Sequence, residues 1–136
     1  MNRSSRAALV VAAALLSACG GGDGTGSASP GPGVLPVTLD DPNSSDRAVV
    51  LTLNGPGQIT AVEAVSAAHV VYTRTQGSTT RVAVFGVIGD GALLHLSVPD
   101  AARAAEYTAT VAEAADASNA ARASVSGYTA TVTRGG

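Results

Sequence analysis

Apolar and polar residues alternate along several short runs that are rich in Val, Ile, Leu and Thr. Successive side chains of a β-strand point to opposite faces, so a period of two predicts strands with one buried face. Clusters of Gly, Pro, Asn and Asp separate the runs and predict turns. Strands are therefore expected at residues 34–39, 48–53, 59–65, 69–74, 81–88, 92–98, 104–112 and 126–133.

Eight short strands at a regular spacing predict an all-β domain, a two-sheet antiparallel sandwich of about eight strands. Val82, Val84 and Ile88 share one face of their run and are expected in the core. Two Ala-rich stretches, residues 100–105 and 112–123, could each hold a helical turn because Ala is the best helix former. For the second stretch a long loop is favoured, since its apolar residues are almost all Ala and would bury too little to anchor a helix.

The pentapeptide Tyr-Thr-Ala-Thr-Val occurs twice, at residues 107–111 and 128–132. Its composition suits a half-buried strand with the Thr side chains outside. We interpret the two copies as strands that share a favourable β composition.

The amino terminus has the three parts of an export signal in residues 1–18. Arg3 and Arg6 give a positive start, and the ten residues 7–16 that follow are all apolar. A spanning helix needs about 20 apolar residues, so this run is expected to engage a translocon and then be cleaved.

Leu16, Ser17, Ala18 and Cys19 end the apolar run and resemble the lipobox of bacterial lipoproteins. The resemblance implies diacylglycerol on the Cys19 thiol, cleavage before Cys19 and acylation, for example by palmitate, of the new amino terminus. Several acyl chains on one residue hold a protein stably on a membrane. Gly20 follows in place of the Asp that commonly retains such proteins on the inner membrane, so an outer membrane is favoured where the cell has one.

Residues 19–33 join this site to the domain at residues 34–136. The segment consists almost entirely of Gly, Ser and Pro and has no large apolar side chain after Cys19, which predicts a flexible linker. Cys19 is the only cysteine, so no intramolecular disulfide can form. The domain must be held by its core alone.

The charge balance argues against nucleic acid as a partner. Of the eight basic residues, Arg3 and Arg6 precede Cys19, which leaves six arginines against ten acidic residues. A nucleic-acid-binding domain usually carries a basic patch. The domain also has no Trp and few other aromatic residues, whereas sugar-binding surfaces usually depend on aromatic platforms.

No constellation of residues predicts an enzyme or a cofactor. His69 and His95 are the only histidines, each is expected in a strand, and neither has a Cys or carboxylate at metal-ligand spacing. A Gly-x-Ser-x-Gly elbow is missing from the sequence, as is a Gly-rich phosphate loop between a strand and a helix. We therefore expect no catalytic residues.

A small acidic cluster, Asp40, Asp41, Asn43 and Asp46, is the strongest candidate for a metal site in the sequence. Closely spaced oxygen ligands suit Ca²⁺, but the spacing lacks the central Gly and the closing Glu of an EF-hand loop. A solvated Asx turn is the preferred interpretation, with calcium at Asp40, Asp41 and Asp46 as the alternative. Asp116 with Asn119 is a weaker case of the same kind.

The order of strands and turns resembles the immunoglobulin-like sandwiches of cohesin-like and carbohydrate-binding modules. The matching features are Gly-Pro-Gly-x-Ile after an early strand, the middle strand at residues 81–86, Gly-x-Leu-Leu-x-Leu-x-Val-Pro, and a late Tyr-x-Ala-x-Val. The resemblance implies recognition of a protein or, with few aromatics, less readily a polysaccharide. The sequence thus predicts a lipid-anchored envelope protein with a binding or scaffolding module. The alternative is a passive structural envelope lipoprotein.

Overall fold

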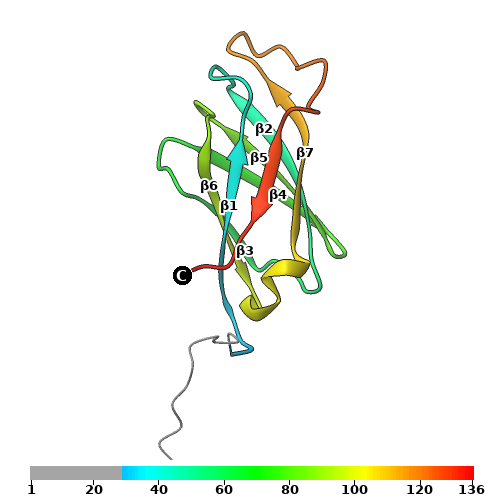
Figure 1. Ribbon diagram of the computed structural model, residues 1–136. Helices are drawn as coiled ribbons and strands as arrows, with labels where there is room; N and C mark the ends of the chain where they lie inside the picture. The colour runs from blue at the N-terminus through cyan, green and yellow to red at the C-terminus, as the bar shows by residue number, and fades with distance from the viewer. Residues whose placement is uncertain (1–28) are drawn as a thin grey trace, which may run out of the picture.

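The computed structural model describes residues 29–136, which form a sandwich of two antiparallel sheets with four strands each (Figure 1). We name the sheet with strand order β3-β6-β1-β8 sheet I and the sheet with order β4-β5-β2-β7 sheet II. The all-β, two-sheet antiparallel sandwich expected from the alternation is confirmed. The strands are β1 (Gly33–Asp40), β2 (Ala48–Asn54), β3 (Ala61–Ala64), β4 (Val70–Gln76), β5 (Thr79–Phe85), β6 (Gly91–Val98), β7 (Thr108–Ala115) and β8 (Thr129–Val132).

Each strand corresponds to one of the runs expected from the sequence, and the largest difference lies before β7. The expected strand at 104–112 begins only at Thr108, because Ala101–Glu106 forms a short 3-10 helix, η1. The Asp100 carboxylate caps this helix by accepting a hydrogen bond from the Ala102 N–H at 3.0 Å. β7 then continues to Ala115, three residues beyond the predicted end of the strand at 112, and the long loop follows it.

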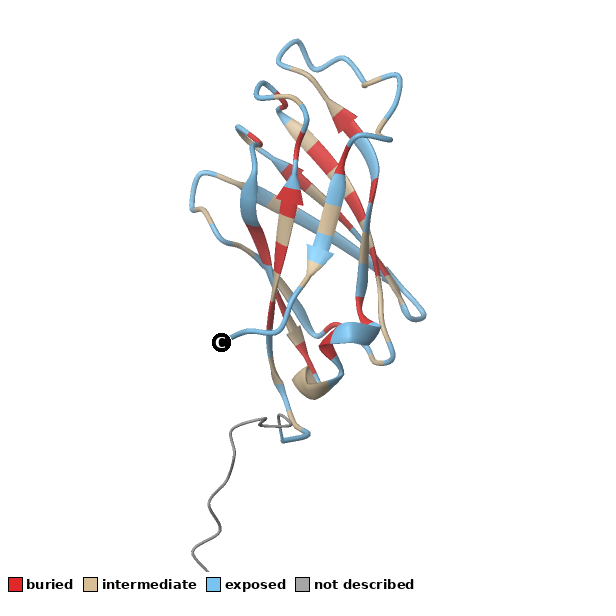
Figure 2. Ribbon diagram, in the orientation of Figure 1, coloured by how far each residue is buried: buried red, intermediate tan, exposed pale blue. Residues whose placement is uncertain are grey.

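Alternation along the strands produces a core between the sheets, and Figure 2 shows buried and more exposed residues following one another along them. Val82 and Val84 of β5 have no exposed surface, as their shared face predicts. Buried residues also include Leu35, Val37, Leu39, Val49, Leu51, Leu53, Ile59, Ile88, Leu93, Leu94, Leu96, Val98, Ala104, Tyr107, Val111, Ala114 and Tyr128. This core is contiguous, which is what holds a domain without a disulfide.

The two copies of Tyr-Thr-Ala-Thr-Val lead into β7 and β8, which lie next to each other in different sheets. Both tyrosines, Tyr107 and Tyr128, are buried just before their strands. The threonines of both copies are exposed, as the composition predicts. The two copies of the motif therefore form the neighbouring edge strands of the two sheets on one side of the sandwich.

β1 enters the sandwich at the end opposite to its connection with β2 (Figure 1). The loops between β1 and β2, β5 and β6, and β7 and β8 gather at the far end, which we call the loop end. The predicted signal peptide at 1–18, Cys19 and most of the predicted linker at 19–33 lie outside the described residues. Of that linker, Gly33 is already part of β1.

Candidate functional site

A buried polar network stabilises the loop end. Asp46, in the β1–β2 loop, has no exposed surface. Its Oδ1 atom accepts hydrogen bonds from Nε of Arg122 at 2.9 Å and from Nη2 at 2.5 Å. The Tyr128 hydroxyl donates to Oδ2, and Asn43 Nδ2 donates to the Tyr128 oxygen at 2.9 Å. The network ties the β7–β8 segment to the β1–β2 loop.

Both oxygens of Asp46 are thus occupied by protein donors. Burial raises the pKa of the Tyr128 hydroxyl, and its hydrogen bond to Asp46 raises it further, so the hydroxyl keeps the proton that it donates. These hydrogen bonds and the paired guanidinium group offset the free-energy cost of burying the Asp46 carboxylate. Asp46 therefore acts as a structural residue of the loop end.

Asp41 lies close to this network, with 7% of its surface exposed. Its Oδ1 accepts the Asn43 N–H at 2.7 Å, which is the Asx turn expected in this segment. Its own N–H donates to Asp90 Oδ1 at 2.5 Å, while its Oδ2 is buried without a partner. Burial raises the pKa of the Asp41 carboxyl, and the nearby Asp46 and Asp90 carboxylates add to the rise.

The structure does not bring the three calcium candidates together. Asp40 is exposed at the end of β1, opposite Thr129, and Asp46 is engaged by Arg122 and Tyr128. Within residues 29–136 no group of three or more His, Cys, Asp or Glu side chains is arranged to hold a metal ion. Asp116 forms a second Asx turn by accepting the Ser118 N–H at 2.8 Å.

The two histidines lie apart. His69 was expected in the strand at 69–74, but it lies directly before β4, which begins at Val70. Its Nε2 lies 2.9 Å from the Val87 carbonyl oxygen. His95 is exposed in β6, opposite Glu63 of β3 in the register. His69 therefore helps to join the β3–β4 and β5–β6 connections, and His95 belongs to the outer face of sheet I.

A different feature stands out on the outer face of sheet II, the face turned away from sheet I. Val70 and Tyr72 of β4 and Phe85 of β5 are 52%, 65% and 45% exposed. The Tyr72 and Phe85 rings meet edge to face, with centroids 5.9 Å apart and an angle of 76° between their planes. Ala83 and Val50 continue the apolar surface across β5 and β2, because Ala83 pairs with both Tyr72 and Val50.

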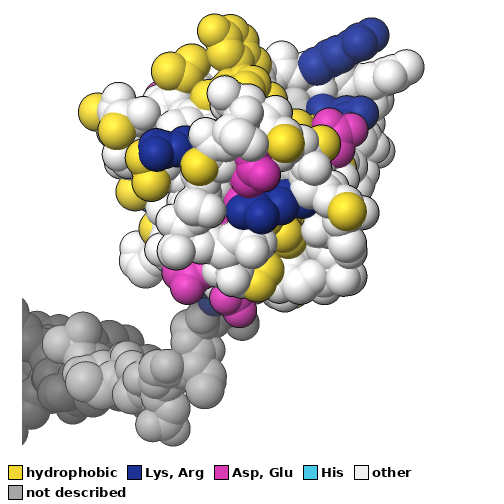
Figure 3. All heavy atoms as spheres, turned by 90° about the horizontal axis from the view of Figure 1, so that it is seen from above, with side chains coloured by type: hydrophobic (Ala, Val, Ile, Leu, Met, Phe, Trp, Pro, Cys, Tyr) yellow, Lys and Arg dark blue, Asp and Glu magenta, His cyan; other side chains and the backbone are white. Residues whose placement is uncertain are grey.

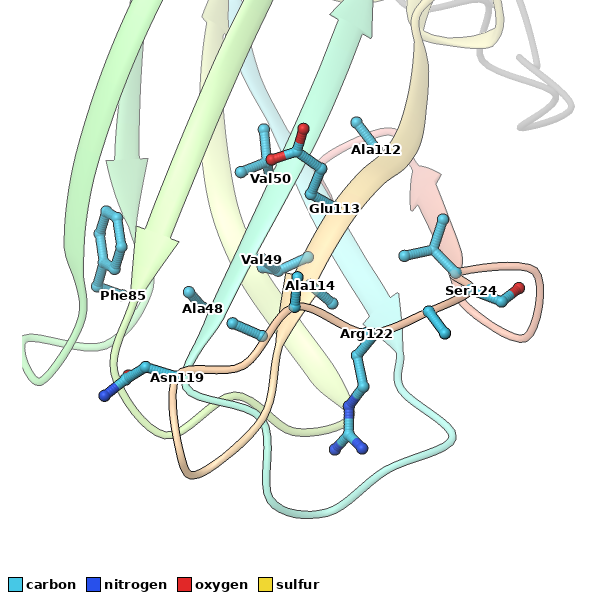
Figure 4. A pocket seen from close by; sticks show the side chains of 14 residues that line it. Ala48, Val49, Val50, Phe85, Ala112, Glu113, Ala114, Asn119, Arg122 and Ser124 are labelled. Carbon is cyan, nitrogen blue, oxygen red and sulfur yellow. The ribbon is translucent and has the colours of Figure 1, made fainter.

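Toward the loop end this apolar surface meets a groove of about 470 Å³. Phe85, Ala48 and Val50 lie along the strands that line it, together with Glu113 of β7 (Figure 4). The segment that carries Arg122 borders the groove on its other side. The Arg122–Asp46 pair therefore helps to shape the groove, since it holds this segment against the sandwich.

The other end of the same face is charged. Arg74 of β4 lies opposite Arg81 of β5 in the register, and Arg81 Nη2 is 3.8 Å from Glu113 Oε1. Arg74, Gln76, Thr79 and Arg81 line a shallow hollow there. Two guanidinium groups and one carboxylate leave this end of the face with a net positive charge.

The outer face of sheet I is different in character. Its register pairs place Glu63 beside His95 and Thr38 beside Thr131, so the middle of this face is polar. Figure 3, a view onto the loop end, shows apolar side chains gathered along one edge of the molecule. The asymmetry makes the outer face of sheet II the candidate functional site.

Sequence reasoning identified the strands but not this face. Val70, Val71 and Tyr72 are apolar at three successive positions, and so are Ala83, Val84 and Phe85. A strand with one buried and one solvent-exposed face needs apolar residues only at every second position. These runs of successive apolar residues interrupt the alternation and could have predicted that sheet II is apolar on its outer face as well as on its inner face.

Comparisons with protein-family models, with curated proteins and with solved structures give no match to this chain. Within residues 29–136, no helix has the length and apolar character needed to cross a membrane.

Proposed function

We propose that this chain is a lipid-anchored protein of the cell envelope whose sandwich binds a protein partner through the outer face of sheet II. The observation that carries the proposal is the exposed apolar surface of Val70, Tyr72 and Phe85, continued by Val50 and Ala83. Contiguous exposed apolar patches mark interaction sites on soluble domains.

The composition of the face supports a protein as the partner. Tyr, Phe and Arg are enriched at the centres of protein interfaces, where a few such residues contribute most of the binding free energy. Tyr72 and Phe85 lie at the apolar end, and Arg74 and Arg81 lie at the charged end. A complementary partner would present apolar side chains and an acidic group at this spacing.

The ring geometry argues against a polysaccharide as the first choice. Sugar rings stack on flat aromatic surfaces, whereas the Tyr72 and Phe85 rings stand at 76° to each other. They form a ridge and not a platform. The resemblance to cohesin-like modules supports the same preference.

The anchor in this proposal is acylated Cys19, 14 residues before β1 begins at Gly33. A Gly- and Ser-rich linker of that length has an end-to-end distance of about 20 Å. The domain would then stay near the outer membrane while the face of sheet II, which runs along its side, remains accessible.

Photo-crosslinking in the cells that make the full chain tests the binding site. A photoreactive amino acid at Tyr72 should capture one discrete protein, whereas the same group at exposed Thr131 of β8 should not. Phe85→Ser should abolish the crosslink. Val34→Ser removes an equally exposed apolar residue from β1 and should leave the crosslink intact. Equal crosslinking from Tyr72 and Thr131 would contradict the proposed site.

Fractionation of the same cells tests the anchor. Cys19→Ala removes the only thiol that can be acylated, so the protein should move from the membrane fraction to the soluble fraction. Cys19→Ala protein that stays in the membrane fraction would refute lipid anchoring, but it would leave the binding-site test intact.

A further inference from the structure

Sheet II ends in β4, an edge strand that is approached, in the described part of the chain, only by the four-residue β3 of sheet I. Six of its seven residues are exposed. All seven pair with β5 in an unbroken register, so β4 has no bulge along this ladder. Within residues 29–136, the backbone hydrogen bonds outside the sheet ladders include none from Val70–Gln76. The groups on the far side of β4 are therefore free to pair.

The other three edges of the sandwich are short or covered. β3 and β8 have four residues each. β7 has a register shift opposite Val50 and Leu51, and a returning segment covers its end through the Ala115–Ala121 bridge and the hydrogen bond from Arg122 N–H to the Ala114 carbonyl at 2.8 Å. Short strands, bulges and covering segments are the usual means of preventing edge-to-edge pairing. β4 uses none of them.

The residues of β4 would favour pairing with their own kind. Its sequence, Val-Val-Tyr-Thr-Arg-Thr-Gln, has no Pro, one charge and five residues with high β propensity. Gly, Pro or several charges would interrupt a new ladder, but none of these occurs within β4. Main-chain pairing at such an edge is a common mode of association.

We propose that β4 pairs with β4 of a second copy of this chain, antiparallel and centred on Thr73, to join two copies of sheet II into one continuous sheet. A two-fold axis through Thr73 gives all seven residues of β4 a partner. It also keeps the outer faces of both copies on the same side, because opposite residues then have the same orientation.

The side chains select this register. Centring on Thr73 places Tyr72 opposite Arg74 of the second copy on the outer face, twice in the dimer. A guanidinium group beside an aromatic ring is a favourable cation–π contact. Centring on Arg74 would instead place two guanidinium groups opposite each other, which is unfavourable. The second copy is therefore a better occupant than an arbitrary extended peptide.

The proposal does not depend on the proposed function. The backbone pairing uses the free edge of β4, whereas the proposed partner site uses the outer face of the sheet; only Tyr72 and Arg74 contribute side chains to both. In the dimer, the two apolar faces would lie side by side and offer a doubled surface.

Disulfide trapping tests the pairing in the full chain carrying Cys19→Ala, which removes the native thiol. Adding Thr73→Cys places two thiols opposite each other at the two-fold axis, within disulfide range. Oxidation at low micromolar concentration should give about tenfold more covalent dimer than Thr110→Cys in β7 or Thr131→Cys in β8, which lie on the other edges. Equal yields, or a higher yield at either of those two positions, would overturn the proposal.

Mixed trapping tests the register. Chains with Tyr72→Cys and chains with Arg74→Cys should crosslink to each other more efficiently than either crosslinks to itself. If Tyr72→Cys or Arg74→Cys chains prefer their own kind, the pairing is not centred on Thr73, and the proposed register is wrong.

A charge at the axis gives a test without thiols. Thr73→Lys puts two ammonium groups opposite each other and should lower the dimer fraction, measured by native mass spectrometry of the Cys19→Ala chain, by about tenfold. Thr110→Lys adds the same charge at an exposed site in β7 and should change the dimer fraction by less than about twofold. Circular dichroism shows whether each variant is folded. A folded Thr73→Lys variant that dimerises like Thr110→Lys would overturn the proposal, as would a starting chain that is monomeric at every concentration.

Discussion

Arg122 donates two hydrogen bonds to one oxygen of Asp46, a residue 76 positions earlier in the chain that has no exposed surface. The pair fixes the segment between β7 and β8 against the loop end and so forms one side of the groove on sheet II. A segment whose apolar residues are mostly Ala gains little from burial, so this polar contact substitutes for a hydrophobic anchor.

Arg122→Ala should destabilise the fold, because it leaves the Asp46 carboxylate buried without its cation. We expect the urea midpoint of unfolding to fall by about 1 M or more, because a buried carboxylate that loses its cation is strongly destabilising. The matched control is Arg103→Ala, which removes an arginine from an exposed pair with Glu106 and should leave the urea midpoint nearly unchanged. Similar losses for both variants would show that burial of Asp46 contributes little.

Local patterns in the sequence predict the strands well and the long-range contacts poorly. The burial of Val82 and Val84 follows from a period of two. Ile88 is buried as well, but β5 ends at Phe85, so Ile88 reaches the core from the β5–β6 connection and not from the same strand face. The contact between Asp46 and Arg122 does not follow from any pattern, because it depends on which loops meet at the end of the sandwich. The strand order within each sheet is fixed by the same long-range packing.

The candidate site was only partly predictable for the same reason. Asp40, Asp41 and Asp46 are neighbours in sequence, yet one is exposed, one is buried in an Asx turn and one is paired with Arg122. Exposure of Tyr72 and Phe85 depends on which face of their strands meets the other sheet. That choice is made by the whole sandwich and not by either strand.

Val84→Asp should unfold the domain, because it buries an unpaired charge in a position with no exposed surface. The expected loss of more than about 4 kcal/mol would remove the cooperative thermal transition seen by circular dichroism. Phe85→Asp places the same charge on the outer face one residue later and should leave the domain folded. A folded Val84→Asp domain would mean that the register of β5 is shifted by one residue.

Gly55→Ala should destabilise the domain through a close approach of the β2–β3 connection to Tyr107. A Cβ atom at Gly55 would overlap the Cδ1 and Cε1 atoms of the Tyr107 ring, which is itself buried. Because the ring must move, we expect a loss of about 2 kcal/mol in chemical denaturation. Gly89→Ala is the control, since nothing lies within 4 Å of its Cβ position, and it should be neutral or slightly stabilising. If the two substitutions cost the same, the contact with Tyr107 is not responsible.

Asp41→Asn should stabilise the domain at neutral pH. Burial raises the pKa of the Asp41 carboxyl in the folded state above its value in the unfolded chain. The folded state therefore binds the proton more tightly, and the unfolding free energy of the natural chain falls as pH rises through the raised pKa. An amide removes this cost at every pH, keeps an oxygen for the Asn43 N–H, and offers donors near the Asp46 and Asp90 carboxylates.

The gain in Tm for Asp41→Asn should be a few degrees at pH 7, where about 1 kcal/mol corresponds to about 4 °C or more. The gain should shrink below about pH 4. Asp40→Asn, a neighbouring exposed substitution, should change Tm little at either pH. A gain for Asp41→Asn that is equally large at low pH would show that the stabilisation comes from the amide contacts and not from removal of a buried charge.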